Sequence, residues 1–224
     1  MRTIPSYYER ALSVYETWGK VCYTVFISSN FTTRLPVIPY DEILPYENLT
    51  SQTYKMIPKI YKAYPHFKWY YFADDNTFLN FENLEKFLSD KSHEDPYIYG
   101  EHFNDYLSGG AGYVIPNHGI QKLVNTLKTN IKFCPNTGVD DRDLIQCLKK
   151  LDFLLGETKD KNGKSRFHPY NVYHHMKNDE KCCAVDYISF HYILPKQMYY
   201  LYKIKLELAN TFKLIKPIFS KVFN

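Results

Sequence analysis

The chain has 224 residues, and its 45% hydrophobic and 23% charged residues are typical of a folded globular protein with one substantial core. The net charge of +4 comes from 28 basic and 24 acidic residues that are interleaved, so we expect no nucleic-acid partner, because nucleic-acid-binding proteins gather Lys and Arg on one surface. No apolar run of 18 residues occurs, and the N-terminus has no apolar signal-peptide core, so we expect neither a transmembrane helix nor a signal peptide in this chain.

The first part of the chain predicts a helix, a strand and a loop. Apolar and aromatic side chains recur at helical spacing over residues 8–18, where Ser6 and Glu9 form a capping-box pattern. Residues 20–29 are rich in β-branched and aromatic side chains, which favours a strand. Residues 29–48 contain three prolines and predict a loop.

The rest of the chain alternates between helices and strands. We expect a helix at 51–65 that Pro58 should kink or divide, a strand at 68–73, a helix after Asn80 and a strand at 96–100. A glycine-rich turn and strand at 108–116 lead to a helix at 118–128, which Asn117 should cap, and to a helix at 140–151. The chain then continues with a polar loop at 157–166, a strand at 184–193 and a helix from Pro195. This alternation predicts one three-layer α/β domain over residues 1–224, without repeats.

Five cysteines bear on the compartment of the protein: Cys22, Cys134, Cys147, Cys182 and Cys183. Adjacent cysteines are difficult to join to each other. In an oxidising compartment we therefore expect Cys182 and Cys183 to pair with Cys134 and Cys147, which leaves Cys22 as the odd thiol.

Two further patterns concern the compartment and metal binding. Glycosylation sequons at Asn30 and Asn48 fit a protein of the secretory lumen. A zinc site would draw on the adjacent cysteines with His168, His174 and His175, but their spacing matches no Cys-x-x-Cys pattern, so we do not expect zinc.

Two carboxylates and an amide follow the strand predicted at 68–73. These residues are Asp74, Asp75 and Asn76. In α/β sheets, ligands bind beyond the carboxyl ends of strands. Carboxylates there can hold a divalent cation, which in turn can hold a diphosphate. The alternative is a solvated turn, since Asp and Asn are common turn residues.

Three more segments hold candidate ligand residues. The sequence SGGAG at 108–112 allows a close approach of the backbone to a ligand, or simply forms a hairpin turn. Asp141 stands at an acidic helix start, where it complements the helix dipole; if it faces a cleft, it can act as a general base. His191 lies near the end of an apolar strand, where histidine is more often structural than a ligand.

In their order along the chain, these segments resemble the Fringe-related β1,3-glycosyltransferases, and among them the core 1 β1,3-galactosyltransferases. The similar stretches run from Arg10 to Tyr199 and are RALSVYETWGKVC, KWYYFADDNTFLNFENLEKFL, YLSGGAGYVIP, VDDRDLIQCL, FHP and CCAVDYISFHYILPKQMY. The motifs SGGAGYV and CC-x-x-D followed by SFHY are the most specific of them.

This resemblance implies a GT-A fold with a mixed central sheet flanked by helices. It also implies transfer of galactose from UDP-galactose to O-linked GalNAc on glycoproteins, in β1,3 linkage and with inversion. The implied cofactor is Mn²⁺, and a homodimer is compatible with the resemblance. Such enzymes act in the Golgi lumen behind an N-terminal membrane anchor, and we find no anchor in this chain.

The resemblance also assigns roles to residues. The metal ligands would be Asp74, Asn76 and His191, and the general base would be Asp141. The nucleotide-sugar-binding residues would be Lys55, Asp74, Asp75, Gly109 and Gly110. Disulfide candidates are Cys134, Cys147, Cys182 and Cys183.

Four departures from the family pattern affect these expectations. Asn76 replaces the metal-binding acid, and because a neutral amide loses the charge that helps to hold a hard cation, we expect weaker metal binding. The chain begins after the first strand of the family, so we expect the sheet to lack that strand and Cys22 to lack its partner. The segment before Cys182 is short and polar where the family has an aromatic acceptor-binding segment, and the sequence DLIQCL replaces the usual Gly-Arg.

Two alternatives stay open. A catalytically impaired paralogue would act as a binding protein or folding chaperone for the active enzyme, which Asn76 and the missing strand favour. A transferase that uses another donor, such as UDP-GlcNAc, is disfavoured by the CC and SFHY motifs.

Overall fold

The computed structural model describes residues 1–29, 34–40, 48–178 and 182–222. Its centre is a four-stranded sheet in the order β3 (Trp69–Phe72), β8 (Tyr113–Pro116), β5 (Tyr97–Gly100) and β9 (Leu154–Leu155). β8 is antiparallel to both of its neighbours and β9 is parallel to β5, so the sheet is mixed. Because the last residue of β3 pairs with the first residue of β8, the turn after β3 and the glycine-rich turn before β8 lie at the same edge.

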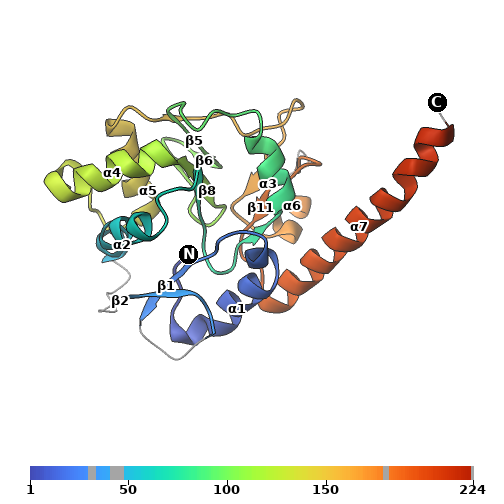
Figure 1. Ribbon diagram of the computed structural model, residues 1–224, viewed down its shortest axis with the longest axis horizontal. Coiled ribbons are helices and arrows are strands. Elements are labelled where there is room, and N and C mark those ends of the chain that lie inside the picture. Colours follow the sequence, from blue (N-terminus) through green and yellow to red (C-terminus); the bar gives the residue numbers. More distant parts are fainter. Residues whose placement is uncertain (30–33, 41–47, 179–181, 223–224) are drawn as a thin grey trace.

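Helices cover both faces of this sheet (Figure 1). α2 (Leu49–Ala63) packs with α4 (Asn117–Thr129) and α5 (Asp140–Lys150) on one side. The other side carries α1 (Tyr8–Glu16), α3 (Phe81–Leu88) and the beginning of α7 (Pro195–Val222), whose far end extends away from the body.

Successive side chains along the strands enter two separate apolar cores, one on each face of the sheet. Tyr70 and Ile115 belong to the core under α2, α4 and α5, whereas Tyr71 and Val114 belong to the core under α1 and α3. A strand directs successive side chains to opposite faces. The result is the predicted arrangement of three layers.

A second, parallel pair of strands stands at the N-terminal edge. β1 (Phe26–Ser29) pairs with β2 (Val37–Tyr40). Arg2 connects this pair to the central sheet through parallel bridges to Ile27 and to Asp74.

The remaining elements are short. A three-stranded sheet has the order β10 (Phe167–His168), β11 (Ser189–Phe190) and β4 (Phe78–Leu79), and β6 (His102–Phe103) forms a hairpin with β7 (Tyr106–Leu107). The other helical segments are α6 (Val172–Asn178), η1 (Pro5–Tyr7), η2 (Trp18–Lys20) and η4 (Ile131–Phe133).

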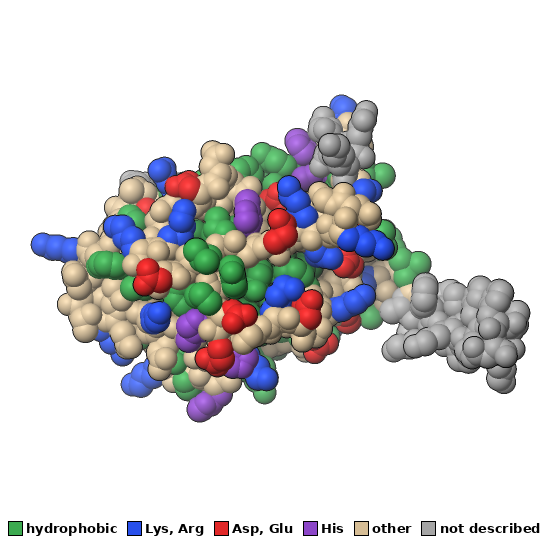
Figure 2. Space-filling view, turned by 90° about the horizontal axis from the view of Figure 1, so that it is seen from above, with side chains coloured by type: hydrophobic (Ala, Val, Ile, Leu, Met, Phe, Trp, Pro, Cys, Tyr) green, Lys and Arg blue, Asp and Glu red, His purple; other side chains and the backbone are tan. Residues whose placement is uncertain are grey.

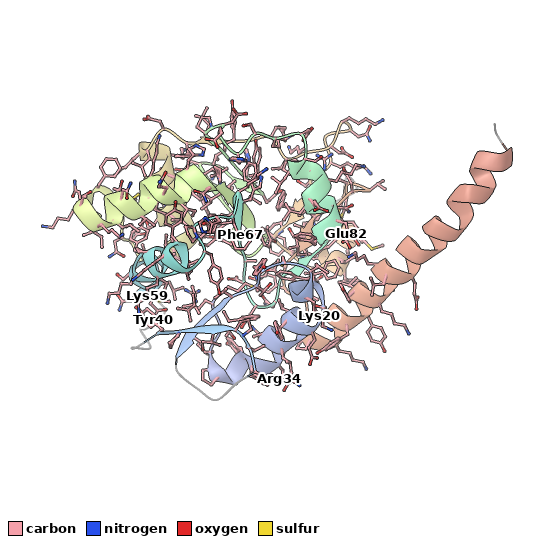
Figure 3. All side chains as sticks on the ribbon, viewed as in Figure 1. Lys20, Arg34, Tyr40, Lys59, Phe67 and Glu82 are labelled. Atoms are coloured by element: carbon pink, nitrogen blue, oxygen red, sulfur yellow. A yellow bond between two sulfur atoms is a disulfide. The ribbon has the colours of Figure 1, made fainter. Side chains whose placement is uncertain are left out.

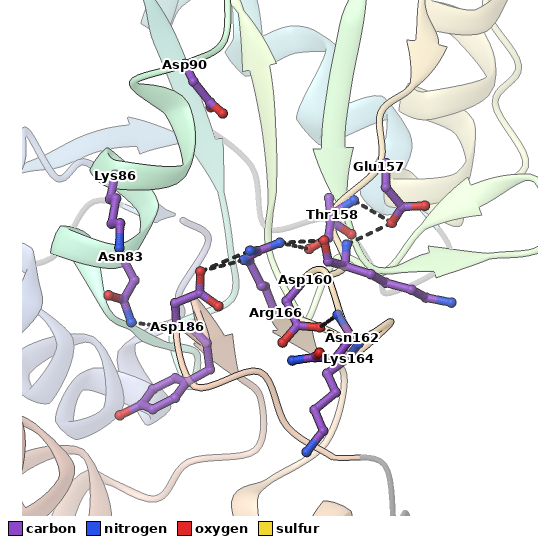
Figure 4. A network of polar contacts seen from close by, with 12 residues as sticks. Asn83, Lys86, Asp90, Glu157, Thr158, Asp160, Asn162, Lys164, Arg166 and Asp186 are labelled. Atoms are coloured by element: carbon purple, nitrogen blue, oxygen red, sulfur yellow. Dashed lines mark hydrogen bonds and ion pairs between the residues drawn. The ribbon is translucent and has the colours of Figure 1, made fainter.

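Arg166 fixes the segments around β10 and β11 to each other (Figure 4). Its Nε and Nη2 atoms donate to Oδ2 of Asp186 at 3.1 and 3.0 Å. Its Nη1 atom donates to the carbonyl oxygens of Thr158 and Lys159 at 3.1 and 2.6 Å. A guanidinium that binds several acceptors at once holds them rigidly. Its partner Asp186 lies shortly before β11, the strand that leads to His191.

The surface carries no single sign of charge on the face seen in Figure 2, where Lys and Arg alternate with Asp and Glu around hydrophobic side chains. Within the described residues, no helix is both long and apolar enough to cross a lipid bilayer. Of the two sequons, Asn30 lies outside the described residues, and Asn48 is exposed immediately before α2.

Most of the predicted helices and strands are confirmed, including the cap at Asn80, whose side chain accepts a bond from the Asn83 amide at 3.4 Å. Three expectations at helices were wrong. The Ser6 and Glu9 pattern makes no cap, because Tyr7 occupies the N-cap position without a side-chain bond. α2 runs continuously through Pro58.

The third wrong expectation concerns Asn117. It lies one residue inside α4 instead of at the cap, and its side-chain amide donates to the carbonyl oxygens of Pro65 and Phe67 at 2.8 and 2.6 Å.

Three strand expectations need correction as well. The strand expected at 20–29 begins only at Phe26, because η2 and a turn occupy residues 18–23. The segment 29–48 contains β2, although it was expected to be a loop. The strand expected at 184–193 is confined to β11, because a turn at Val185 and Asp186 delays its start and the chain leaves the sheet after Phe190.

The disulfides also differ from the expected pairing. Cys134 is joined to Cys147, and Cys182 is joined to Cys183. Cys134 and Cys147 are buried in the core under α4 and α5, whereas Cys183 packs against the other core, so the sheet separates the two pairs. Cys22 is the free cysteine, as expected.

The zinc candidates come close together without providing thiolates. Ligand atoms of His168, Cys182 and Cys183 lie within 4.8 Å of one another. Because the two sulfurs form a disulfide, the cluster offers no thiolate for zinc in this structure.

Candidate active site

A cavity of about 950 Å³ opens at the edge of the central sheet. It runs between β1 and β3 and is bounded by α2 on one side and α3 on the other. Phe67, labelled in Figure 3, is one of the lining residues and lies near the centre of the molecule. Asp74, Gly109, Gly110 and Asp141 line the same cavity, so the structure brings four of the predicted site residues together.

The acidic turn follows β3 directly, and the amide of Thr77 closes it by donating to the carbonyl oxygen of Asp74 at 3.2 Å. The side chain of Asp74 is 47% exposed and faces the cavity. Burial alone would raise the pKa of Asp74, but the hydrogen bond to His191, the electrostatic attraction of that ring and the positive charge of Arg2 outweigh it and hold that pKa below its ordinary value.

Asp75 points in a different direction from Asp74, as neighbouring residues in a turn often do. It is only 6% exposed and does not line the cavity. Burial, together with the negative charge of Asp74, raises the pKa of Asp75 to about 6. Asp75 is therefore better placed to shape the turn than to contact a ligand.

Asn76 is half-buried at the end of the turn, and its carbonyl oxygen accepts a bond from the amide of Ile193 at 2.9 Å. That bond holds the segment after β11 against the acidic turn. Within the described part of the chain, the side-chain amide of Asn76 makes no hydrogen bond, but Asn76 does not line the cavity, so its role as a metal ligand stays a prediction.

His191 reaches the acidic turn from β11. Its Nδ1 atom lies 3.3 Å from the carbonyl oxygen of Pro169, which can only accept, so Nδ1 carries a proton. Its Nε2 atom lies 3.4 Å from Oδ2 of Asp74. The backbone carbonyl thus orients the ring so that the second nitrogen faces the carboxylate, which is the usual arrangement of a metal-binding histidine.

Gly109 and Gly110, adjacent residues of the turn before β8, contact Asp141 and His191. The amide of Gly109 donates to Oδ2 of Asp141 at 2.8 Å. A Cβ atom on Gly110 would lie 2.1 Å from Cε1 and Nδ1 of His191, so only glycine permits this approach. The glycine-rich turn is therefore the support that brings Asp141 and His191 to one site.

Asp141 stands at the start of α5 with both carboxylate oxygens engaged by backbone amides, those of Gly109 and Arg142. Burial raises the pKa of Asp141 above its ordinary value, despite these two donors, and the negative charges of Asp140 and Asp74 add to the rise. A half-buried carboxylate with a raised pKa that faces a cavity is suited to accept a proton from a substrate.

The other two acids of this helix start have structural partners. Asp143 is buried and accepts bonds from the Thr50 hydroxyl and from the amide and hydroxyl of Thr137. Asp140 accepts from Thr53 at 2.9 Å and lies 3.5 Å from the guanidinium of Arg2. These contacts fix the orientation of α5, and with it the position of Asp141.

The structure does not bring Lys55 to this site. Lys55 is exposed on α2 and does not line the cavity, whereas Thr53 and Ile57 on the same helix do. Two residues of helix correspond to about 200° of rotation, which turns Lys55 away from the side chains at the cavity. Its role in donor binding stays a prediction.

Two participants were not expected from the sequence. The carbonyl oxygen of Pro169 sets the orientation of His191, and Arg2 connects Asp74 with Asp140 through a backbone bridge and an ion pair. From the sequence, Pro169 could be identified only because the FHP stretch is similar to the family. Arg2, a single arginine near the N-terminus, could not be identified from any pattern.

The donor set fits a divalent cation. Asp74 and His191 offer an oxygen and a nitrogen that face each other at 3.4 Å, and the free amide oxygen of Asn76 lies on the same turn. Oxygen ligands with one imidazole suit Mn²⁺ better than soft metals. The residues present are therefore compatible with the cation that the sequence resemblance implies.

Comparison with curated proteins identifies a homologue. The chain is 27% identical over 220 residues to glycoprotein-N-acetylgalactosamine 3-beta-galactosyltransferase 1 of Xenopus laevis, and the alignment covers 86% of this chain. The chain spans 61% of the length of that relative. No protein-family model matches the chain.

Comparison with solved structures tests the fold. A glycosyltransferase involved in the glycosylation of the major capsid of PBCV-1 is similar with a TM-score of 0.52 and 11% identity, over 91% of this chain and 98% of that one. This similarity shows a glycosyltransferase fold of mixed α/β type and confirms the predicted GT-A class. The chain is accordingly a relative of the core 1 β1,3-galactosyltransferases with a glycosyltransferase fold.

Proposed function

We propose that this protein is a β1,3-galactosyltransferase that transfers galactose from UDP-galactose to O-linked GalNAc on glycoproteins, with inversion. The observation that carries the proposal is the convergence of Asp74, His191 and Asp141 on one glycine-rich turn at the edge of the sheet. The similarity to a curated galactosyltransferase supports the choice of donor and acceptor.

Asp74, Asn76 and His191 would hold Mn²⁺ at the carboxyl end of β3. When bound, the cation would offset the negative charge that develops on the departing UDP. Pro169 keeps the His191 ring in place through Nδ1. Gly109 and Gly110 leave the backbone bare beside this position, so that a nucleotide-sugar can approach closely.

Asp141 is the general base of the proposed reaction. It would accept the proton of the acceptor 3-hydroxyl as that oxygen attacks the anomeric carbon from the face opposite UDP. Its raised pKa favours proton transfer, and the Gly109 amide keeps the carboxylate at the cavity wall. A single displacement of this kind inverts the anomeric centre.

The disulfides agree with a lumenal location. Two disulfides within one chain are typical of proteins that fold in an oxidising compartment. We therefore propose a location in the secretory pathway, with the Golgi lumen as the compartment in which the sequence resemblance implies that such enzymes act.

A second candidate function is supported by Asn76. A neutral amide at the metal site lowers the charge available to a hard cation, and a protein that binds acceptor or partner without turnover would tolerate that loss. Such a protein would act as a binding or chaperone-like paralogue of an active enzyme.

Purified protein incubated with UDP-galactose, a GalNAc-bearing peptide and Mn²⁺ tests the proposal. We expect galactosylated peptide, detected by mass, and no product when UDP-GlcNAc replaces UDP-galactose. Absence of product at every Mn²⁺ concentration, with UDP binding intact, would favour the binding protein. Transfer from UDP-GlcNAc alone would indicate a different donor.

A further inference from the structure

A second cavity, of about 670 Å³, lies beside β5 and β9, at the edge of the central sheet opposite the first cavity. One of its walls is the C-terminal half of α3 with the turn that follows, and the other is the segment after β9. Pockets for small ligands commonly enclose about 300–1,000 Å³. Among the described residues, Lys91 alone lines both cavities, so a ligand here would bind apart from a nucleotide-sugar.

Two tyrosines make one side of this second cavity aromatic. Tyr97 is 37% exposed, and its ring centroid lies 6.4 Å from that of the buried Tyr99. A Cβ atom on Gly156 would lie 2.2 Å from the Tyr99 ring, so glycine is what permits the backbone after β9 to approach it. An exposed aromatic ring beside polar groups suits a sugar, whose C–H groups pack on the ring while its hydroxyls form hydrogen bonds.

Three acidic residues line the second cavity, and each already has a donor within the protein. Asp186 accepts from Arg166 at 3.1 and 3.0 Å, as Figure 4 shows. Asp90 accepts from the ammonium of Lys91 at 2.9 Å. Glu157 accepts from the backbone amides of the two residues that follow it, both at 2.8 Å. These contacts engage the negative charges of the cavity.

Two positive charges of the second cavity are not engaged in this way. Lys86 is on α3 and Lys159 follows β9, so they belong to opposite walls. Within the described residues, neither Nζ atom forms a hydrogen bond or an ion pair, although the charge of Lys159 acts on the nearby Glu157. Four basic residues thus line the cavity against three acidic ones. Ammonium groups without a carboxylate partner in a cavity favour an anionic ligand.

We propose that the second cavity binds an acidic sugar of a glycan chain, with its carboxylate held by Lys86 and Lys159 and its ring packed on Tyr97. Arg166 donates to the carbonyl oxygen of Lys159 at 2.6 Å and holds that wall in place, so little ordering is needed on binding. An acidic peptide fits less well, because an extended chain needs a groove or a free sheet edge. This site goes beyond the proposed function, since it binds without transfer.

Titrations of the full chain, followed by NMR, test the proposal with three probes. These are 3′-sialyllactose, which has one carboxylate, the neutral lactose, and a hexaglutamate peptide. We expect 3′-sialyllactose to bind at least tenfold more tightly than either of the others, and severalfold more weakly when salt is raised from about 0.05 M to about 0.5 M. Equal affinity for lactose, tighter binding of hexaglutamate, or no binding of 3′-sialyllactose would overturn the proposal.

Variants assign the binding to this cavity. Lys86→Gln combined with Lys159→Gln should weaken 3′-sialyllactose binding at least tenfold, and Tyr97→Ala should weaken it severalfold. The matched control combines Lys128→Gln with Lys132→Gln, which removes the same charge from exposed residues outside the cavity and should leave binding unchanged. Equal affinity in the two double variants would contradict the proposal.

A competition experiment separates this site from the candidate active site. Excess UDP with Mn²⁺ should leave 3′-sialyllactose binding unchanged, because the two ligands occupy different cavities. Displacement by UDP would place the acidic sugar in the first cavity and would refute the proposal. None of these measurements involves transferase activity, so their failure is distinct from failure of the proposed function.

Discussion

The Nε2 atom of His191 lies 3.4 Å from Oδ2 of Asp74, although the two residues follow strands of different sheets. The contact exists because Gly110 leaves room for the imidazole and because the Pro169 carbonyl accepts from its Nδ1 atom, which leaves Nε2 to face Asp74. An acidic turn, which in isolation would be solvated, thereby becomes one side of a candidate metal–diphosphate site.

Replacing Asp141 with Asn should abolish transfer while UDP binding persists, because the amide cannot accept the proton but retains the size of the carboxylate. In the unmodified protein, kcat should fall as the pH drops through the raised pKa of this carboxyl, since the base must be deprotonated to act. Transfer rates and UDP titrations of both proteins check this. Turnover in Asp141→Asn above a hundredth of the original rate would remove Asp141 from the role of base.

Replacing Asn76 with Asp should lower the Mn²⁺ concentration that gives half-maximal transfer, by about tenfold or more, because the turn gains a charged ligand. A Mn²⁺ titration of initial rates measures the effect. The matched control is Asn125→Asp on α4, which adds the same charge at an exposed side chain outside the cavity. An identical Mn²⁺ requirement in Asn76→Asp and the unmodified protein would place Asn76 outside the metal site.

Replacing Gly110 with Ala should displace the His191 ring, since the added carbon would lie 2.1 Å from two of its atoms. We expect UDP affinity in the presence of Mn²⁺ to fall at least tenfold. Gly163→Ala is the control: nothing lies within 4 Å of the new carbon, and the backbone strain that alanine adds at its positive φ of +74° falls on an exposed turn that does not line the cavity. If both variants bind UDP alike, the close contact between Gly110 and His191 does not matter for the site.

The stability of the protein should depend on the protonation of Asp75. Its pKa is raised from 3.8 to about 6 in the folded protein, so the folded state holds this proton more tightly than the unfolded state. The free energy of unfolding should therefore fall as the pH rises from about 4 to about 6, by about 3 kcal/mol. Denaturant unfolding without metal at several pH values measures this, and the step should disappear in Asp75→Asn. The same step in both proteins would assign it to another group.

Much of the fold could be predicted because its signals are local. The strand before Asp74 and the cap at Asn80 each depend on residues close in sequence. β2 was not predictable in this way, because its prolines indicate a loop; at the edge of a sheet, a strand tolerates Pro39 since one side of its backbone needs no partner.

The candidate site was predictable in its members but not in its contacts. Asp74, Asp141 and His191 were identified from motifs in family order, but the bond from Gly109 to Asp141 joins segments far apart in sequence. Whether Lys55 faces the cavity depends on the rotational phase of α2, which packing sets. The disulfide pairing likewise depends on which core each cysteine occupies.

The central claim is that Asp74 and His191 hold a cation that in turn holds a diphosphate. Isothermal titration of UDP, with and without Mn²⁺, tests it most directly in the unmodified protein, in His191→Ala and in the exposed control His174→Ala. We predict that Mn²⁺ strengthens UDP binding at least tenfold in the unmodified protein and in His174→Ala, and has no effect in His191→Ala. Equal UDP affinity with and without Mn²⁺ in the unmodified protein would contradict the account.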